Sequence, residues 1–146
     1  MDFTPRDRDV LARTVYGEAR GERWLGKAAV AWSVLNRVAI DLRGDGRPDW
    51  WGEGIAAVCL APWQYSAWNE NDPNREALLR VTVADPFFRE CLAVVDAVLA
   101  GDEPDPTDGA THYKVTKLAW PKDWGPQEQA IVKPVIGGHS FYVIRS

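Results

Sequence analysis

The sequence predicts a mainly helical α+β fold that forms one domain over residues 1–146. A chain of this length buries roughly 68–70% of its unfolded surface, so a single core can stabilise it without disulfides. Apolar residues recur at helical spacing through about residue 100. From Gly109 onward this periodicity is lost, and short apolar and aromatic segments predict a small β element late in the chain.

The first predicted helix begins near Thr4 and ends at about Glu18 or Ala19. The hydroxyl of Thr4 can cap this helix, and Pro5 suits its first position because the ring already fixes a helical φ. The carboxylate of Asp7 is favourable near the positive end of the helix dipole.

Three further helices are predicted. One runs from about Trp24 to Leu42 with a broad apolar face, and the Gly- and Pro-containing segment 43–48 ends it. A short helix covers residues 54–60, and a longer one begins at Asp85–Pro86 and stops at Gly101. Segment 61–69 mixes polar groups with large aromatic residues and is expected to be a structured loop.

The β element is expected in residues 110–113 and 136–144, two extended segments joined by a loop rich in Trp and Pro. Segment 102–108 contains two prolines and is expected to be a stiff connection. The chain has no internal repeats and no linker, which agrees with one domain.

Composition excludes several classes of function. The formal net charge is -4 and the basic residues are scattered, so neither nucleic acid nor an anionic membrane is an expected partner. No stretch of about 18 apolar residues exists, so no stable membrane insertion is expected. The N-terminal residues do not form a signal peptide, and we expect a monomer made in the cytoplasm.

The cysteines and histidines do not predict a metal site. Cys59 and Cys91 lie among apolar neighbours, which favours buried free thiols over a disulfide. His112 and His139 are far apart in sequence, and no CxxC or HExxH spacing is present. We therefore expect no cofactor.

Glu18 is the strongest candidate for a functional residue. It continues the helix face that carries Val10 and Val15. Burying a carboxylate is costly unless it is paired, or protonated for a reason, so an inward glutamate indicates a site. Gly17 and Gly21 would leave room for a ligand near the backbone. The pattern alone equally allows a solvated glutamate on the last turn.

The sequence contains eight tryptophans, many of them in predicted loops. Indole rings stack on the apolar faces of sugar rings, so loop tryptophans beside a groove favour glycan binding. They could instead fill the core of a loop-rich protein. The residues concerned are Trp50, Trp51, Trp63, Trp68, Trp120 and Trp124.

Three clusters combine polar and aromatic residues more densely than packing requires. They cover residues 16–22, residues 63–68, and the pair of segments 109–113 and 136–142. The candidate site residues in them are Tyr16, Glu18, Glu22, Gln64, Tyr65, Ser66, His112, Tyr113, His139 and Tyr142.

Together these clusters resemble the SleB/CwlJ-type cell wall hydrolases, which include the spore-cortex-lytic catalytic domain and relatives among phage endolysins. The specific part is the run YGEARGE at 16–22 followed by LNRV at 35–38. The resemblance spans residues 12–142. After Tyr113 the sequence departs from the family's usual continuation.

The resemblance implies a lysozyme-like fold of the lytic-transglycosylase type. It also implies cleavage of the β-1,4 bond between N-acetylmuramic acid and N-acetylglucosamine in peptidoglycan glycan strands. The catalytic glutamate of the family maps onto Glu18. The other candidate residues are then expected to contact the substrate, with Gln64, Tyr65 and Ser66 bonding the N-acetyl groups. His112 and His139 are expected to bond the sugar or brace Glu18, or to be structural.

Glycoside cleavage needs an acid that protonates the leaving oxygen, and a carboxyl in a semi-apolar pocket keeps its proton near neutral pH. A second carboxylate would act as nucleophile or base. Glu22 is the nearest in sequence, but it is expected to pair with Arg20 or Arg23, or to cap the second helix. Without a second carboxylate the substrate's own 6-hydroxyl attacks, so we expect lytic transglycosylation, with a hydrolytic muramidase as the alternative.

Two other classes of function remain. A cysteine peptidase or amidase would use Cys59 or Cys91 with a histidine, but the apolar neighbours of both thiols disfavour it. A non-catalytic glycan-binding module would keep the tryptophans and have no need of Glu18. For the favoured class, the missing signal peptide predicts an endolysin that reaches the wall after holin-type release.

Overall fold

The structure is a computed structural model that describes residues 2–42, 52–62 and 64–144. Helix α1 (Pro5–Ala19) begins as the sequence predicts. The hydroxyl of Thr4 accepts a hydrogen bond from the backbone N–H of Asp7 at 3.1 Å, and the Asp7 carboxylate accepts one from the N–H of Thr4 at 3.0 Å. This reciprocal capping box satisfies two N–H groups at the start of α1.

The other predicted helices are present. They are α2 (Trp24–Leu42), α3 (Ile55–Leu60) and α5 (Pro86–Leu99), and the carboxylate of Asp85 caps α5 by accepting from the Phe87 N–H at 2.8 Å. The predicted break at 43–48 lies outside the described residues, as do Trp50, Trp51 and Trp63.

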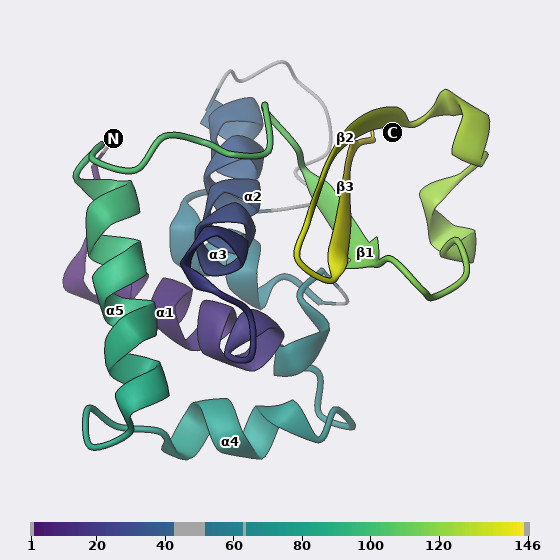
Figure 1. Ribbon diagram of the computed structural model, residues 1–146. Coiled ribbons are helices and arrows are strands. Elements are labelled where there is room, and N and C mark those ends of the chain that lie inside the picture. The colour runs from purple at the N-terminus through teal and green to yellow at the C-terminus, as the bar shows by residue number, and fades with distance from the viewer. Residues whose placement is uncertain (1, 43–51, 63, 145–146) are drawn as a thin grey trace.

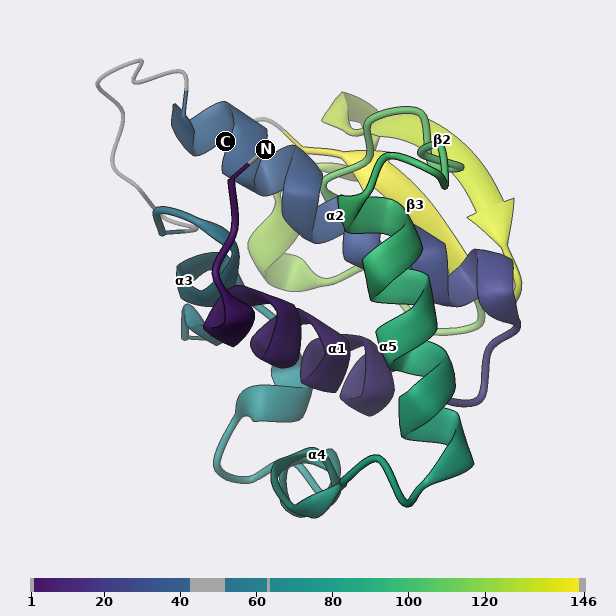
Figure 2. The same cartoon turned by 90° about the vertical axis from the view of Figure 1, so that its left-hand side faces the viewer.

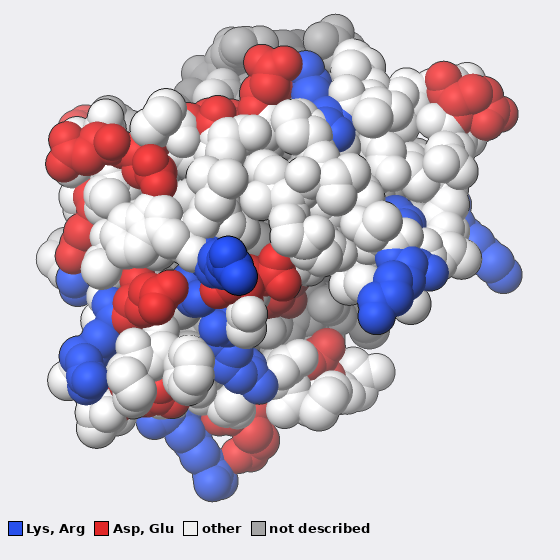
Figure 3. Space-filling model, viewed as in Figure 1, with Lys and Arg blue, Asp and Glu red and all other residues white. Residues whose placement is uncertain are grey.

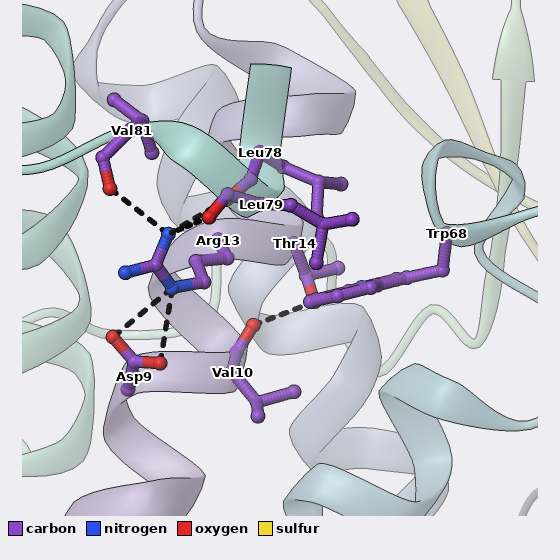
Figure 4. A network of polar contacts seen from close by, with 8 residues as sticks. All are labelled: Asp9, Val10, Arg13, Thr14, Trp68, Leu78, Leu79 and Val81. Carbon is purple, nitrogen blue, oxygen red and sulfur yellow. Dashed lines mark hydrogen bonds and ion pairs between the residues drawn. The ribbon is translucent and has the colours of Figure 1, made fainter. Parts of the chain in front are cut away.

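Two short helices between α3 and α5 were not predicted: η1 (Ser66–Trp68) lies inside the expected loop, and α4 (Asn74–Arg80) follows it. Contacts with α1 hold both (Figure 4). The Arg13 guanidinium donates to the carbonyls of Leu78 and Val81 at 2.7 and 2.9 Å, and the Trp68 indole donates to the Thr14 hydroxyl at 2.8 Å. The Arg13 contacts satisfy carbonyls at the end of α4 that a short helix leaves without partners, and the Trp68 contact joins η1 to α1.

The β element is a three-stranded antiparallel sheet of order β1-β3-β2. Strands β1 (His112–Val115) and β3 (His139–Val143) lie in or beside the two predicted segments. Strand β2 (Ile131–Ile136) was not predicted, because it contains Pro134, which cannot donate to a neighbouring strand. The register is irregular between Val132 and Val135, around this proline. Two short 3-10 helices, η2 (Lys122–Trp124) and η3 (Gln127–Gln129), lie between β1 and β2.

Helix α2 lies between the α1–α5 pair and the sheet (Figures 1 and 2). The main core joins the helices, and it includes Leu11, Val15, Val30 and Val34, which are fully buried. A smaller cluster of Ala29, Ala110, Ile136 and Phe141 packs the sheet onto α2. The mainly helical α+β class is therefore confirmed.

The surface carries acidic and basic side chains in mixture, and the face in Figure 3 is largely uncharged over the sheet. That uncharged area agrees with the exposure of Ile131, Val132 and Val135 on β2. Within the described ranges, no helix has the length and apolar character needed to cross a membrane.

Candidate active site

Glu18 lies in the last turn of α1 and is partly buried. Its Oε1 accepts a hydrogen bond from the Tyr113 hydroxyl, and its Oε2 accepts one from the Ala67 N–H at 3.0 Å. The two donors belong to β1 and η1, which are 95 and 49 residues away in sequence. The carboxyl group is therefore held where three elements meet.

Burial raises the pKa of Glu18 above its usual value, and the charge of Asp72 acts in the same direction. The hydrogen bonds from Tyr113 and Ala67 oppose this rise because they favour the charged carboxylate. The group thus holds its proton to higher pH than an ordinary glutamate, while two donors remain to stabilise the anion once the proton has left.

Tyr113 is held among aromatic rings on the inner face of the sheet. Its ring centroid lies 5.0 Å from that of His139, 5.5 Å from that of Phe141 and 6.3 Å from that of Tyr65. Burial raises the pKa of Tyr113 well above its ordinary value, so the hydroxyl stays protonated and can donate to Glu18.

Gly17 has a different role from the one expected. A Cβ at this position would lie 2.7 Å from both the Ala67 Cβ and the Leu78 Cδ2. Gly17 therefore lets η1 and α4 pack closely against α1, and the space beside it is filled by protein. Gly21, by contrast, has no atom within 4 Å of an added Cβ.

Glu22 connects the turn after α1 to the turn between β2 and β3. Its Oε1 accepts from the Gly138 N–H at 3.1 Å and lies 4.0 Å from the His139 Nδ1. Its backbone carbonyl accepts from the buried Lys27 ammonium, which also pairs with Glu90 at 3.2 Å. The side chain thus binds the hairpin, a partner that the sequence did not predict.

His139 is 8% exposed, and its Nδ1 has no hydrogen-bond partner among the described residues. Burial lowers the pKa of His139, against the opposing charge of Glu22. His139 contacts Tyr113 through its ring and therefore supports Glu18 indirectly.

Arg37, from α2, fixes the loop before η1. It is 3% exposed, and its Nη1 donates to the Gln64 Oε1 at 3.2 Å while its guanidinium lies 4.7 Å from the Tyr65 ring centre. Ser66 is exposed at the start of η1. Tyr65 is 1% exposed and its hydroxyl bonds the Ser33 hydroxyl at 2.9 Å, so its side chain packs in the core beneath this loop.

His112 and Tyr142 lie on the outer face of the sheet. His112 pairs with Tyr142 across β1 and β3, directly next to the pair of Tyr113 and Phe141. Successive residues of a strand point to opposite faces, so His112 and Tyr142 project from the face opposite to Tyr113. The His112 ring lies 5.1 Å from that of Trp124, and the Tyr142 ring lies 5.0 Å from that of Trp120.

Burial, with the charge of Arg37, lowers the pKa of His112 to about 3. The sequence predicted that the two residues cluster, but the sheet separates them from Glu18.

Tyr16 also faces away from Glu18, since it lies two positions earlier on the same helix. Its hydroxyl donates to the Asp85 carboxylate at 2.9 Å, and its ring packs edge-on against Phe88. Tyr16 lines a shallow open groove with residues of α4, α5 and their connection, and Glu18 does not line this groove. The structure therefore places Tyr16 on the side of α1 that packs against α5, away from Glu18.

The described tryptophans make structural contacts. The Trp24 and Trp32 indoles both donate to Glu103, and the Trp120 indole donates to the Gly125 carbonyl at 2.8 Å. The sequence also predicts that Trp50, Trp51 and Trp63 lie beside a groove, but these three residues are outside the described ranges.

Both cysteines are buried and free, as predicted. Burial raises the pKa of Cys59 to about 12 and that of Cys91 to about 11. A thiol nucleophile needs a lowered pKa and access to substrate, so the structure contradicts the cysteine peptidase reading. Among the residues that the structure describes, no group of His, Cys, Asp and Glu could hold a metal ion.

Three contributors to the site were missed from the sequence: Arg37, Asp72 and the backbone N–H of Ala67. A signal existed for Arg37, because Ser33 and Arg37 place polar groups one turn apart on the otherwise apolar face of α2. No side-chain pattern marks a backbone donor such as Ala67.

Known proteins resemble this chain along most of its length. The sequence profile of the Cell Wall Hydrolase family matches residues 21–142. A spore cortex-lytic enzyme of Bacillus subtilis is 32% identical over 139 residues, or 91% of this chain, and one of Halalkalibacterium halodurans is 32% identical over 111 residues, or 76% of it. The chain spans 38% and 28% of the lengths of these two relatives.

Two solved structures also resemble this chain over most of its length. The catalytic domain of the germination-specific lytic transglycosylase SleB from Bacillus anthracis superposes with a TM-score of 0.69 at 26% identity, covering 96% of each chain. That of the Bacillus cereus SleB protein superposes with a TM-score of 0.61 at 26% identity, covering 97% of this chain and 92% of the other. The lysozyme-like fold implied by the sequence is thus confirmed, and the chain belongs to the cell wall hydrolase family.

Proposed function

We propose that this chain cleaves peptidoglycan glycan strands as a lytic transglycosylase, with Glu18 as general acid and then general base. The observation that carries the proposal is the carboxyl of Glu18, held between the Tyr113 hydroxyl and the Ala67 N–H and raised in pKa by burial. The profile match begins at residue 21, so the role of Glu18 rests on this geometry. The B. anthracis relative is described as a lytic transglycosylase, which supports the reaction type.

The reaction needs one carboxyl group in two protonation states. Protonated Glu18 gives its proton to the glycosidic oxygen as the bond from C1 of N-acetylmuramic acid breaks. The C6 hydroxyl of the same sugar then bonds to C1, and the Glu18 carboxylate takes the hydroxyl proton. The products are a 1,6-anhydromuramic end and a free 4-hydroxyl on N-acetylglucosamine, and no water is consumed.

The donors to Glu18 serve the step in which its charge appears. Hydrogen bonds to an ionised group are roughly twice as strong as bonds between neutral groups. Tyr113 and Ala67 therefore stabilise the carboxylate more than the acid, which eases proton transfer to the leaving oxygen.

Hydrolysis is the second candidate, and Asp72 is the observation that favours it. The charge of Asp72 acts on Glu18, and one of its oxygens accepts from the Asn74 N–H at 2.8 Å. Asp72 could orient a water as a second carboxylate. Glu22 is the other carboxylate considered from the sequence, and its side chain binds the Gly138 N–H of the hairpin beside His139.

Product analysis with Glu18→Gln tests the proposal. Gln keeps the shape and loses the transferable proton, so we expect a fall in glycan cleavage on the order of 10²–10⁴-fold with an unchanged melting temperature. Mass spectrometry of wild-type digests should find 1,6-anhydro ends, lighter by one water than hydrolytic ends. Reducing ends in the wild-type digest, lost in Asp72→Asn, would establish the muramidase instead. A folded Glu18→Gln protein with wild-type cleavage would refute both.

The wall on which the enzyme acts is a separate question. The sequence predicts an endolysin, whereas the relatives described above are named spore cortex-lytic enzymes. Parallel digestion of vegetative and cortex peptidoglycan distinguishes the two substrates, and faster release from cortex would assign the chain the specificity in its relatives' names.

A further inference from the structure

We infer that Arg37 is a positioning residue that turns Gln64 into a hydrogen-bond donor for the carbonyl oxygen of an N-acetyl group, so that the enzyme prefers N-acetylated over de-N-acetylated glycan. The inference rests on the proposed function and specifies its substrate.

The orientation of the Gln64 amide follows from its partner. A guanidinium has donors and no acceptor, so only the amide oxygen can face it. The Arg37 Nη1 meets the Gln64 Oε1 at 3.2 Å. The amide NH₂ therefore points away from Arg37, and Gln64 offers its two N–H donors to a ligand.

Arg37 itself is held rigidly. Its Nε donates to the Thr111 carbonyl at 2.6 Å, which ties the end of α2 to the segment leading into β1. The guanidinium lies over the Tyr65 ring, and the Tyr65 hydroxyl is bonded to Ser33 one turn earlier on α2. Arg37 is 3% exposed, so solvent does not compete for its donors. The buried and immobilised guanidinium of Arg37 thus fixes the orientation of the Gln64 amide.

Gln64 belongs to the same loop as the donor to Glu18. It is partly buried and three residues before Ala67, whose N–H binds the Glu18 carboxylate. The charge of Arg37 also acts on Glu18. A sugar whose glycosidic oxygen approaches Glu18 therefore lies close to the loop that carries Gln64.

The two forms of the amino sugar differ in the group that would meet Gln64. An N-acetyl group presents a carbonyl acceptor, whereas a de-N-acetylated sugar presents an ammonium, which only donates. If the Gln64 N–H groups face this ammonium, each group meets a donor and neither finds an acceptor. The de-N-acetylated sugar therefore binds less tightly. The preference for N-acetylated glycan should therefore depend on the amide and on the residue that orients it.

The test compares kcat/KM on N-acetylated peptidoglycan and on the same material after enzymatic de-N-acetylation. Wild type should prefer the first by about tenfold or more, as expected when a hydrogen bond is lost. Gln64→Glu keeps an acceptor for Arg37 and replaces the donors, so the preference should vanish, mainly through a higher KM on N-acetylated glycan. Gln127→Glu, the same change in exposed η3, is the control and should keep the wild-type ratio.

Arg37→Lys tests the positioning role. Lysine keeps the charge and loses the planar fork, so the amide is free to rotate and the preference should shrink while kcat on N-acetylated glycan changes less than KM. If Arg37→Lys does not fold, Gln64→Met replaces it, and both substrates should then be cut with similar KM. A wild-type ratio in Gln64→Glu, with Glu18→Gln inactive, would overturn this inference alone. Activity in Glu18→Gln would overturn the proposed function instead.

Discussion

At the scale of single residues, Glu18 combines two opposed effects. Burial disfavours its charge, while Tyr113 and Ala67 favour it. An acid that must later act as a base needs both, because a carboxyl that only resisted ionisation would not release its proton. Of the two donors to Glu18, only the Tyr113 hydroxyl can be removed by a substitution, because the other donor is the backbone N–H of Ala67.

Tyr113→Phe should raise the pKa of Glu18 further, because it removes a hydrogen bond that favours the carboxylate. The high-pH limb of the kcat/KM profile should therefore move to higher pH, and the maximal rate should fall because the anion is less stabilised. A pH profile of glycan cleavage checks both effects. A limb that moves to lower pH would show that Tyr113 does not stabilise the carboxylate of Glu18.

The sequence predicted Glu18 and missed its surroundings for a physical reason. A polar residue on an apolar helix face is a local pattern, visible within one or two turns. Its partners are 49 and 95 residues away, and one of them is a backbone group. The same limit misplaced Tyr16 and His112, since proximity in sequence and membership of one motif do not specify the face on which a side chain projects.

At the scale of elements, the helices that carry their own caps were predictable. Thr4 with Asp7, and Asp85 with Pro86, mark the starts of α1 and α5 in the sequence. The N-cap residue of α4 is Pro73, which has no polar side chain, so the Asp72 carboxylate accepts from the Asn74 N–H instead, and Arg13 of α1 binds the carbonyls at the other end. Such elements depend on tertiary contacts, and Gly17 makes one of these contacts possible.

Gly17→Ala should destabilise the protein by about 1–3 kcal/mol, because the new methyl group overlaps Ala67 and Leu78 and must displace η1 or α4. Cleavage should fall as well, since the Ala67 N–H moves relative to Glu18. Gly21→Ala is the matched control, with open space around the added methyl, and should stay within about 0.5 kcal/mol of wild type. Chemical denaturation measures both, and equal stability of the two variants would contradict the packing role.

We expect Glu22 to stabilise the β2–β3 hairpin and to take no part in glycan cleavage. Glu22→Gln keeps an acceptor for the Gly138 N–H, so activity and melting temperature should change little, whereas Glu22→Ala should cost about 1 kcal/mol of stability. Turbidity clearance and thermal unfolding distinguish the two. Complete inactivity of Glu22→Gln at an unchanged melting temperature would make Glu22 a second catalytic carboxylate.

At the scale of the whole molecule, buried histidine makes the fold sensitive to acid. The pKa of His112 falls from 6.5 to about 3 on folding, so the unfolded chain binds a proton first as the pH drops. The stability contributed by neutral His112 is present above about pH 6.5 and is lost as the pH falls toward 3.

His112→Gln should flatten the dependence of unfolding free energy on pH between 6.5 and 3 by an amount on the order of a few kcal/mol. Glu18, whose pKa is raised, contributes with the opposite sign, so the difference between wild type and variant isolates the histidine. Urea titrations at several pH values in this window provide the measurement. Parallel curves for the two proteins would show that His112 is not buried in its neutral form.

The contacts of Glu18 with Tyr113 and of Glu22 with Gly138 close loops of 95 and 116 residues. Closing loops of this length is slow and costs chain entropy, so we expect both contacts to form late in folding. During synthesis, Glu18 leaves the ribosome long before β1 and β3 exist. A nascent or C-terminally truncated chain therefore holds the acid without its tyrosine donor, and the ability to cut a glycan is gained only when the last hairpin has been made and has docked.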